Sequence, residues 1–575
     1  MTGNQLQDVG DLLRSKDVIN EDQLQIIRGH QNHRNLPVHR LILDLNFASE
    51  RDTIQALAEI HSVEFRHLED YIIPEDLLEI VPLKLIFHYR FIPLSRNNDV
   101  ITIAYGDVPS SLELANLRLL LKQEVQFVLT TPSCIDAIIK SQFGLGAETV
   151  QKLRESKGHL LNDHELIFDL SDSSKDSAVD GTISDLVAQI LAEALRLQTT
   201  DIHFEPYADS IKLRYRIDGI LQSIPVPGEL RPLYAAITSR LKVMAELDIS
   251  ERRIPQDGRI SMKTEGEAYD LRVSVIPTKH GEALCLRILG RQSLLLGFEQ
   301  LGMLPNQEAL FGQITSLPQG LILISGPTGS GKTTTLYAAL GRANDEQRKI
   351  ITIEDPIEYQ IEGITQMQTH DRIGLSFSKG LRSILRHDPD IVLVGEIRDK
   401  ETAEIAVRAS QTGHLVFSTI HANDSLSTIP RLIDMGVETS TLSASLNCSI
   451  AQRLARRTCN RCMNADPTAQ PEMIREMAEA LNLPDDQLRI HRGEGCVECQ
   501  QTGIKGRIAI YEFAPIDESL AEAIYSRASL TQLRRAAKSM GWKPLRQLAF
   551  HRIQDGTISL AELQRVTWRL DFSQI

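Results

Sequence analysis

The chain of 575 residues is too long for one hydrophobic core and indicates about three to four domains. Its 42% hydrophobic and 24% charged residues are ordinary for a globular protein. Lys plus Arg number 62 and Asp plus Glu number 76, so the formal net charge is −14, which disfavours a protein that binds DNA or anionic lipid through its overall charge.

The cellular location is predicted from two absences and from the cysteines. No apolar run approaches the roughly 18 residues needed to span a bilayer. The first residues, MTGNQLQDVGDLLRSK, contain no apolar core of a signal peptide. Four of the seven cysteines form two CxxC pairs, while Cys134, Cys285 and Cys448 are scattered, which fits a reducing compartment. We therefore expect a cytoplasmic protein.

The first part of the chain is predicted to contain helices, a small α/β domain and a linker. Residues 1–60 are expected to be helical, because two similar stretches there offer Asn20 and Ser49 as N-caps. Residues 61–145 are expected to form an α/β domain with a strand in ITIAYGD and a helix in LELANLRLLL. The polar stretch DLSDSSKDSAVDG lies in a predicted linker over 146–181.

Two further domains are predicted after the linker. Residues 182–300 combine an amphipathic helix with four alternating strands, IKLRYRID, GRISMKT, YDLRVSVIP and ALCLRIL, and so predict a compact α+β domain. From 301 to 575, the apolar runs GLILISG, KIITIED, DIVLVGE and HLVFSTI alternate with helices, as in a parallel sheet buried on both faces. The predicted fold class is therefore α/β, with a helical C-terminus.

A phosphate-binding loop is predicted between one of these strands and the next helix. GPTGSGKT matches G-x-x-x-x-G-K-[ST] in the strand–loop–helix context that this motif requires. The glycines would turn backbone N–H groups toward nucleotide phosphates, and the helix N-terminus adds positive potential. Lys332 is expected to reach the β- and γ-phosphates and Thr333 to bind Mg²⁺. The predicted nucleotide contacts are Gly326, Pro327, Thr328, Gly329, Ser330, Gly331, Lys332, Thr333 and Thr334.

Carboxylates and histidines stand at the ends of other predicted strands. Glu396 ends DIVLVGE, and Glu354 ends KIITIED, so both are expected at the carboxyl edge of the sheet, where ligands bind. They are candidates for the metal-orienting and water-positioning groups that hydrolysis requires. His414 and His421 flank the strand HLVFSTI. A histidine there can sense the γ-phosphate or orient a carboxylate, but a satisfied structural histidine is the alternative for each.

The two CxxC pairs predict a metal site. Cys459/Cys462 and Cys496/Cys499 supply four thiolates, which suit one tetrahedral Zn²⁺ with no open position and hence a structural role, within an insertion over 455–510. Free thiols or a redox pair are the alternatives. The loop 463–495 has little apolar content of its own, so the metal is expected to order it.

Together these motifs resemble the type II secretion and type IV pilus assembly ATPases. The resemblance covers about 180–575 and, more loosely, 61–145. It is carried by TTDIHFEP, ISERRIPQDGRI, LRVSVIPTKHGEALCLRIL, GPTGSGKTTTLYAAL, ITIEDPIEYQI, residues 381–424 and the CxxC pairs. It implies a homo-hexameric motor that uses ATP, Mg²⁺ and structural Zn²⁺, with a RecA-like catalytic domain and a PAS-like N2 domain. It also implies docking on the bacterial inner membrane through a platform protein, and no nucleic-acid partner.

The resemblance further implies roles for individual side chains. Glu354 is expected to be the base that polarises water, Glu396 to hold Mg²⁺ together with Thr333, and His421 to act beside them. Arg272 and Arg287 of the N2 domain are expected to approach the phosphates when the domains close, with interdomain salt bridges as the alternative for these and the other arginines. The remaining residues implied near the nucleotide are Asp355, Glu358, His414, Arg382, Arg386, Arg398 and Arg507.

Departures from the family bear on ligands and on function. Some relatives bind cyclic di-GMP through a duplicated motif that begins Arg-Leu-Gly; the corresponding stretches here, Asp8-Val9-Gly10 and Val38-His39-Arg40, lack the leading arginine, so this ligand is not expected. The long N-terminal region and the CxxC pairs are typical of assembly motors and not of retraction motors.

Several functions are compatible with these motifs. The alternatives to an assembly motor are a nucleotide-gated docking scaffold with little turnover and a zinc-ribbon DNA motor. The complete set of Lys332, Glu354 and Glu396 favours the motor, while the net charge of −14 disfavours the DNA motor. Secretion, pilus assembly and DNA uptake share this motor core, so all three pathways stay open at this stage.

Overall fold

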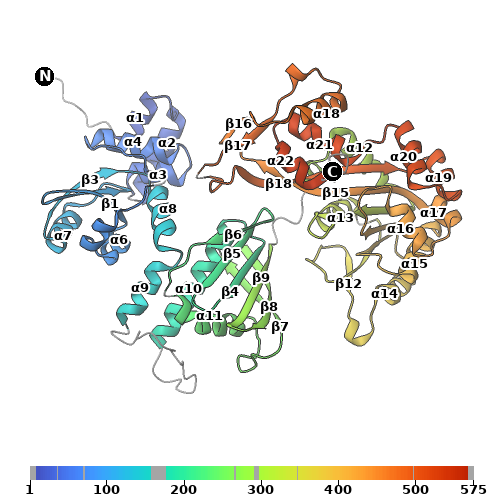
Figure 1. The fold of residues 1–575 in the computed structure, drawn as a ribbon, viewed down its shortest axis with the longest axis horizontal. Coiled ribbons are helices and arrows are strands. Elements are labelled where there is room, and N and C mark those ends of the chain that lie inside the picture. The colour runs from blue at the N-terminus through green and yellow to red at the C-terminus, as the bar shows by residue number, and fades with distance from the viewer. Residues whose placement is uncertain are drawn as a thin grey trace. The chain divides into compact units, whose positions relative to one another are not determined.

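A computed structural model describes residues 8–34, 36–68, 71–156, 177–228, 230–264, 267–290, 297–345, 347–496 and 498–567 (Figure 1). The chain divides into two compact units, one made of 1–264 with 270–288 and the other of 265–269 with 289–575. No helix in the described ranges combines the length and the apolar character that crossing a membrane requires. The linker predicted over 146–181 lies mostly outside the described residues; its two ends belong to helices α9 and α10.

The first unit begins with four helices: α1 (Val9–Ser15), α2 (Glu21–Arg34), α3 (Val38–Asp44) and α4 (Glu50–Ile60). The predicted N-caps form, because Asn20 Oδ1 accepts the Gln23 N–H at 2.8 Å and Ser49 Oγ accepts the Asp52 N–H at 3.1 Å. Both sequence copies therefore start their second helix by the same local rule.

A small sheet follows these helices and shares their core. The strands β1 (Phe91–Asn97), β2 (Val100–Tyr105) and β3 (Glu124–Leu129) lie in that order, and β2 pairs antiparallel with β1 and parallel with β3. Side chains from the helices and from β2 pack into one cluster. The helices of this part are α5 (Glu75–Ile80), α6 (Leu83–Tyr89), α7 (Ser111–Leu121), α8 (Pro132–Phe143) and α9 (Ala147–Ser156).

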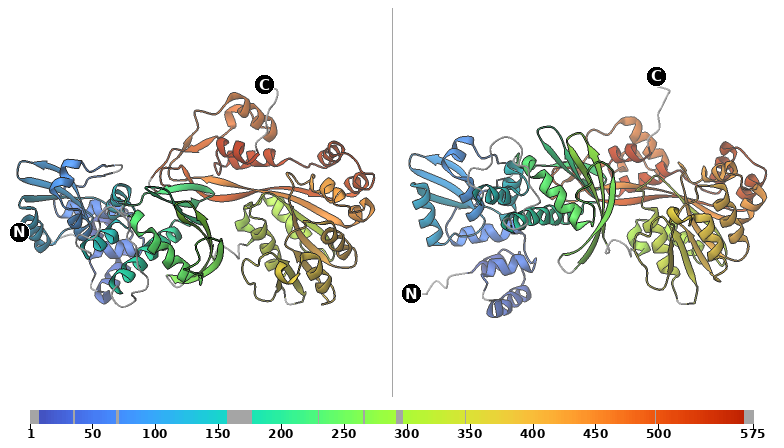
Figure 2. Two further views of the ribbon diagram at one scale, coloured as in Figure 1. Left: turned by 60° about the horizontal axis from the view of Figure 1, so that its bottom comes forward. Right: turned by 90° about the horizontal axis from the view of Figure 1, so that it is seen from below.

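The rest of the first unit is a six-stranded sheet with two helices on one face (Figure 2). The strand order is β6-β5-β4-β9-β8-β7. Tyr215 donates to the Ile190 carbonyl at 2.7 Å and Tyr234 to the Glu282 carbonyl at 2.6 Å, which ties the sheet to both helices. The elements are α10 (Ser177–Arg196), β4 (Asp201–Pro206), β5 (Ile211–Ile217), β6 (Ile220–Ile224), α11 (Leu230–Met244), β7 (Gln256–Thr264), β8 (Glu267–Thr278) and β9 (Gly281–Gly290).

The second unit is built on a seven-stranded sheet in the order β12-β11-β13-β14-β10-β15-β18. The first six strands run parallel, and β18 is antiparallel to β15. The predicted parallel sheet and the α/β fold class are thus confirmed. The strands are β10 (Gly320–Ser325), β11 (Ile350–Glu354), β12 (Thr365–Gln368), β13 (Ile391–Val394), β14 (Leu415–Ile420), β15 (Leu446–Thr458) and β18 (Ile504–Pro515).

Both faces of this sheet are covered, as the apolar runs predict. Along β10, Leu321 and Leu323 enter one hydrophobic core, while Ile322 and Ile324 enter another on the opposite face. The helices of this unit are α12 (Pro305–Ile314), α13 (Lys332–Ala343), α14 (Phe377–Ile384), α15 (Lys400–Gln411), α16 (Thr428–Asp434), α17 (Thr439–Ser445), α18 (Pro471–Leu481), α19 (Glu518–Tyr525), α20 (Leu530–Ser539), α21 (Leu545–Gln554) and α22 (Leu560–Thr567). A small hairpin, β16 (Met463–Ala465) with β17 (His491–Gly493), completes it.

Candidate functional site

The glycine-rich loop connects β10 to α13 at the carboxyl edge of the parallel sheet. Gly331 has a φ of +85°, and a Cβ there would lie 2.9 Å from Gln452 Nε2, so only glycine fits this turn. Lys332 Nζ donates to the carbonyl oxygens of Gly326 at 2.9 Å and Pro327 at 3.0 Å. Ser330 Oγ is buried and has no hydrogen-bond partner. A glycine-rich loop with the Lys332 ammonium over it and an unpaired Ser330 hydroxyl inside it fits a phosphate group.

The ammonium group of Lys332 lies in a mixed electrostatic environment. Burial lowers its pKa, the negative charge of Glu396 works in the opposite direction, and the positive charge of Arg453 adds to the lowering. Lys332, Glu396 and Arg453 therefore lie close enough to interact. A phosphate bound in the loop would supply the anion that this pair of cations favours.

Glu396 is the centre of a second cluster at the same edge. The backbone around it continues between β11 and β14, because the Gly395 N–H donates to the Ile353 carbonyl at 2.8 Å and the Ile397 N–H donates to the Thr419 carbonyl at 2.9 Å. Its Oε1 lies 2.8 Å from His421 Nε2, and its Oε2 accepts from Arg398 Nε at 2.7 Å.

Arg398 joins this cluster to the end of β11. Its NH1 lies 3.4 Å from Asp355 Oδ2, and the hydrogen bond to Glu396 raises the pKa of its guanidinium group. The fold thus brings together Lys332, Asp355, Glu396, Arg398 and His421, which the sequence places in four separate segments. Two carboxylates beside a phosphate loop are oxygen ligands that suit Mg²⁺.

Glu354, the carboxylate that is predicted to act as the base, lies inside the fold, and its assignment as the base stays a prediction. The side chain is 4% exposed, and both carboxylate oxygens are engaged. Oε1 accepts from Thr352 Oγ1 at 2.6 Å and Gln366 Nε2 at 3.2 Å, and Oε2 accepts from the Tyr337 hydroxyl. These bonds tie α13 to β11 and β12 inside the fold. Glu358, four residues later, is exposed.

The two histidines lie at opposite edges of the sheet. His414 precedes β14, and its backbone carbonyl accepts from the Gly320 N–H at the start of β10, whereas His421 follows β14. Six strand residues separate them, or about 20 Å at about 3.3 Å per residue. His414 Nδ1 lies 2.9 Å from the Ala409 carbonyl. Within one chain His414 therefore lies at the end of β14 opposite to His421, and its contact with the nucleotide stays a prediction.

The remaining predicted arginines belong to other elements than the glycine-rich loop. Arg382 pairs with Glu401 at 2.5 Å, and Arg386 donates to the Arg382 carbonyl at 2.8 Å. Arg507 lies opposite Arg456 in the β15–β18 ladder. Arg272 and Arg287 belong to the first unit, where Arg287 Nε donates to Asp201 Oδ1 at 2.9 Å.

Arg453 is a site residue that the sequence reasoning missed. It lies in β15 beside the glycine-rich loop, and it donates to the carbonyl oxygens of Gln452 at 3.1 Å and Asn423 at 2.7 Å. Burial lowers the pKa of its guanidinium group. The only signal was a basic residue within the apolar run CSIAQRLA, which a strand beside the loop strand would place at the ligand edge.

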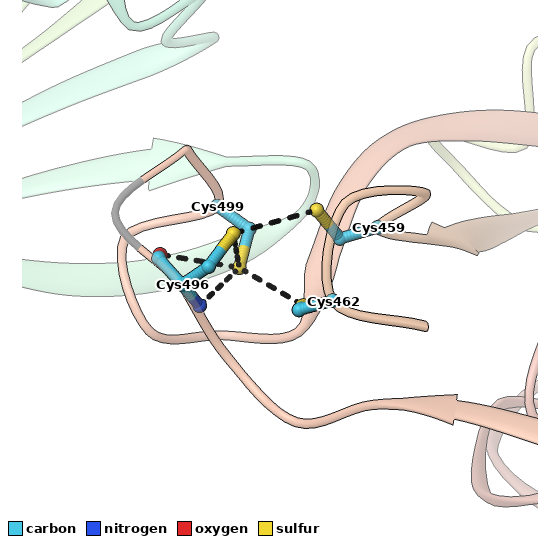
Figure 3. Close-up of side chains that lie close together, drawn as sticks. All are labelled: Cys459, Cys462, Cys496 and Cys499. Atoms are coloured by element: carbon cyan, nitrogen blue, oxygen red, sulfur yellow. Dashed lines mark hydrogen bonds between the residues drawn. The ribbon is translucent and has the colours of Figure 1, made fainter. Parts of the chain in front are cut away.

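The four cysteines of the CxxC pairs come together in the described structure (Figure 3). The sulfur–sulfur distances are 3.8 Å for Cys459 to Cys496, 3.8 Å for Cys462 to Cys499 and 3.6 Å for Cys496 to Cys499. Tetrahedral zinc with Zn–S bonds of about 2.3 Å places sulfurs about 3.8 Å apart. The donor set and its spacing therefore fit Zn²⁺.

Backbone N–H groups point at two of these sulfurs. Cys499 Sγ accepts from the N–H groups of Cys496 and Gly503, each at 3.2 Å, and Cys462 Sγ accepts from the Gly495 N–H at 3.3 Å. Burial by itself would raise the pKa of the Cys499 thiol, but these N–H groups and the neighbouring thiols lower it to about 7. Donors of this kind support the thiolate form that binds metal.

The insertion between the cysteine pairs packs against the C-terminal helices, a contact that the sequence analysis did not predict. Met473 and Met477 of α18 are buried against Phe550 of α21 and Leu563 of α22. Arg546 also pairs with Glu476 at 2.5 Å. The apolar partners come from the C-terminal helices, roughly seventy residues further along the chain, as the separation of Arg546 and Glu476 illustrates.

Comparison with known proteins gives a consistent result. Residues 176–565 match the family described as type II/IV secretion system protein, and residues 61–148 match the MshEN domain. A type IV pilus assembly ATPase PilB of Myxococcus xanthus is 36% identical over 96% of this chain and 98% of its own length. A type II secretion system protein E of Xanthomonas campestris is 36% identical over 96% of each chain. Another protein of that name, from Pseudomonas aeruginosa, is 44% identical over 68% of this chain and 76% of its own length.

Proposed function

Because the chain belongs to the family of type II/IV secretion system proteins, we propose that it is a Mg²⁺-dependent ATPase motor that powers the assembly of pilus or pseudopilus subunits. The observation that carries this proposal is the gathering of Lys332, Glu396, Arg398 and His421 at the edge where the phosphate loop lies. The motor would act as a homo-hexamer in the cytoplasm, docked on the inner membrane through a platform protein.

The site residues are proposed to have different roles in hydrolysis. The loop N–H groups and Lys332 bind the phosphates, and Thr333 with Glu396 would hold Mg²⁺, which supplies charge neutralisation at the β- and γ-phosphates. His421 and Arg398 hold the two oxygens of Glu396 and so orient it. Because Glu354 is buried and both of its oxygens accept hydrogen bonds from neighbouring side chains, we propose Glu358, an exposed carboxylate of the same segment, as the base in its place.

Turnover of the purified full-length chain separates this proposal from a docking scaffold. A motor is expected to hydrolyse ATP repeatedly, at a rate that depends on Mg²⁺ and rises as the hexamer forms. A scaffold would bind ATP and release phosphate at no more than one equivalent per chain. Phosphate release measured across a range of protein concentrations, alongside the oligomeric state, distinguishes the two.

The N2 arginines are proposed to act on the transition state. Replacing Arg287 by alanine is expected to lower kcat by about a hundredfold, the effect of losing one transition-state donor, while the affinity for a non-hydrolysable ATP analogue changes little. The matched control is Arg214→Ala on β5 of the same sheet, which removes a guanidinium paired with Glu205. A loss of analogue binding with kcat unchanged would show a ground-state clamp instead.

The cysteine cluster is proposed to hold one structural Zn²⁺ per chain. Purification under reducing conditions without chelator is expected to yield one zinc per chain, and Cys496→Ser to lower that content and to loosen residues 459–505 locally. Global unfolding is not expected, because α18 has an apolar core with α21 and α22. Cys134→Ser, outside the cluster, is the control and should keep full zinc content. Zinc near zero in the unmodified protein, with all four thiols reactive, would refute the site.

A further inference from the structure

A buried carboxylate contacts the loop 421–427, which begins with His421, and takes no part in the reaction described above. Glu512, in β18, is 1% exposed. Its Oε1 accepts from the backbone N–H of Ser425 at 2.8 Å and from the Ser425 hydroxyl at 2.5 Å, and its Oε2 accepts from the Leu545 N–H at 2.6 Å. A buried carboxylate held by neutral donors carries a desolvation cost.

Ser425 belongs to the loop 421–427, which connects β14 to α16 and begins with His421. On the nucleotide side, this loop is tied to Arg453, which donates to the Asn423 carbonyl at 2.7 Å, and to Ser325, whose hydroxyl donates to the Asp424 carbonyl at 3.4 Å. Its first residue, His421, lies 2.8 Å from Glu396. Movement of the loop would therefore change the position of the histidine that orients the metal carboxylate.

The opposite side of the loop is attached to the C-terminal helices. The Ser425 hydroxyl accepts from Trp542 Nε1 at 3.2 Å, and Asp424 Oδ2 pairs with Arg534 of α20 at 2.5 Å. Glu512 also accepts a hydrogen bond from the Leu545 N–H at the start of α21. The Ser425 hydroxyl thus connects the loop 421–427 both to Glu512 of β18 and to Trp542, which lies between α20 and α21.

We propose that Ser425 and Glu512 are positioning residues that hold the loop 421–427 so that His421 reaches Glu396, and that the C-terminal helices act on the ATPase site through them. The proposal rests on the proposed ATPase function. It gives a role to the C-terminal helices, which contribute no residue to the phosphate loop. Helices α20 and α21 fix the position of the loop 421–427, and this loop fixes the position of Glu396 through His421. Neither residue touches the nucleotide in this scheme.

A double-mutant cycle with His421 tests the proposal on the full-length hexamer. Ser425→Ala keeps the backbone bond to Glu512 but removes the hydroxyl, and is expected to lower kcat about fivefold, the scale of one net hydrogen bond, with KM nearly unchanged. In a His421→Ala background, the same change should cost less than about twofold, because the group that Ser425 positions is then absent. Glu512→Gln, which turns an amide N–H₂ toward one of the N–H donors, should behave in the same way.

Glu562→Gln is the matched control for a purely structural effect. Glu562 is also buried, at 3% exposed, and anchors α22 to β15 through Arg456. This variant should lower the melting temperature, and its effect on kcat should be the same with or without His421.

The outcomes separate the two proposals. If the unmodified protein does not turn over ATP, the proposed function fails. If it does, and Ser425→Ala lowers kcat equally in both backgrounds or leaves it unchanged, the positioning role is overturned. If Ser425→Ala loses its effect only where His421 is missing, the role is supported.

Discussion

Replacement of Lys332 by alanine is expected to lower ATP hydrolysis by at least about a hundredfold to a thousandfold, the cost of removing one preorganised charge from a phosphoryl-transfer site. Lys332 is the only cation in the described loop 326–334, and it folds over that loop through its bonds to Gly326 and Pro327. Steady-state phosphate release by the full-length protein, at saturating Mg²⁺ and ATP, measures the effect.

The fold should survive this change. Among the described residues, the Lys332 ammonium donates only to backbone carbonyls of its own loop, and burial already lowers its pKa. Alanine therefore removes a partly desolvated charge and no buried partner. Lys538→Ala, an exposed lysine on α20, is the control and should keep turnover within about twofold, as surface changes usually do. Normal turnover by Lys332→Ala would place the catalytic site elsewhere.

The second large effect is expected at Glu358. Glu358→Gln should lower kcat by about a hundredfold to ten-thousandfold, the range for loss of a general base, while ATP and Mg²⁺ still bind. Glu354→Gln should retain most activity, because its amide oxygen can still accept from Thr352 and Gln366, and the Tyr337 hydroxyl can rotate to accept from the amide N–H₂. Single-turnover hydrolysis and analogue binding of both variants make the comparison.

Stability measurements complete this test. Glu354→Ala leaves Tyr337, Thr352 and Gln366 without their acceptor and should cost about 1–3 kcal/mol per unsatisfied buried group, so the catalytic domain should melt earlier. Glu358→Gln, at an exposed position, should melt as the unmodified protein does. Loss of hydrolysis in Glu354→Gln with an unchanged melting temperature would restore Glu354 as the base.

Features that depend on local pattern were predictable from the sequence. The parallel strands, the phosphate loop and the Ser49 cap each follow from the identity of a few consecutive residues, since strand burial, glycine conformation and helix capping are local properties. Several strands were not predicted, among them β4 and β6, because DIHFEP and ILQSI lack a long alternation of apolar and polar residues. The packing of the metal insertion was not predicted, because its apolar partners, Phe550 and Leu563, lie far along the chain.

The sequence by itself determined which residue types stand at the ends of which strands. Only the tertiary structure decided which of them face the nucleotide site. Glu354 and Glu396 both end buried strands, yet Glu354 points to Tyr337 inside the fold while Glu396 meets Arg398 and His421 at the open edge. The direction of a side chain at a strand end depends on which helix or strand packs against it, and those partners come from segments that local pattern cannot pair.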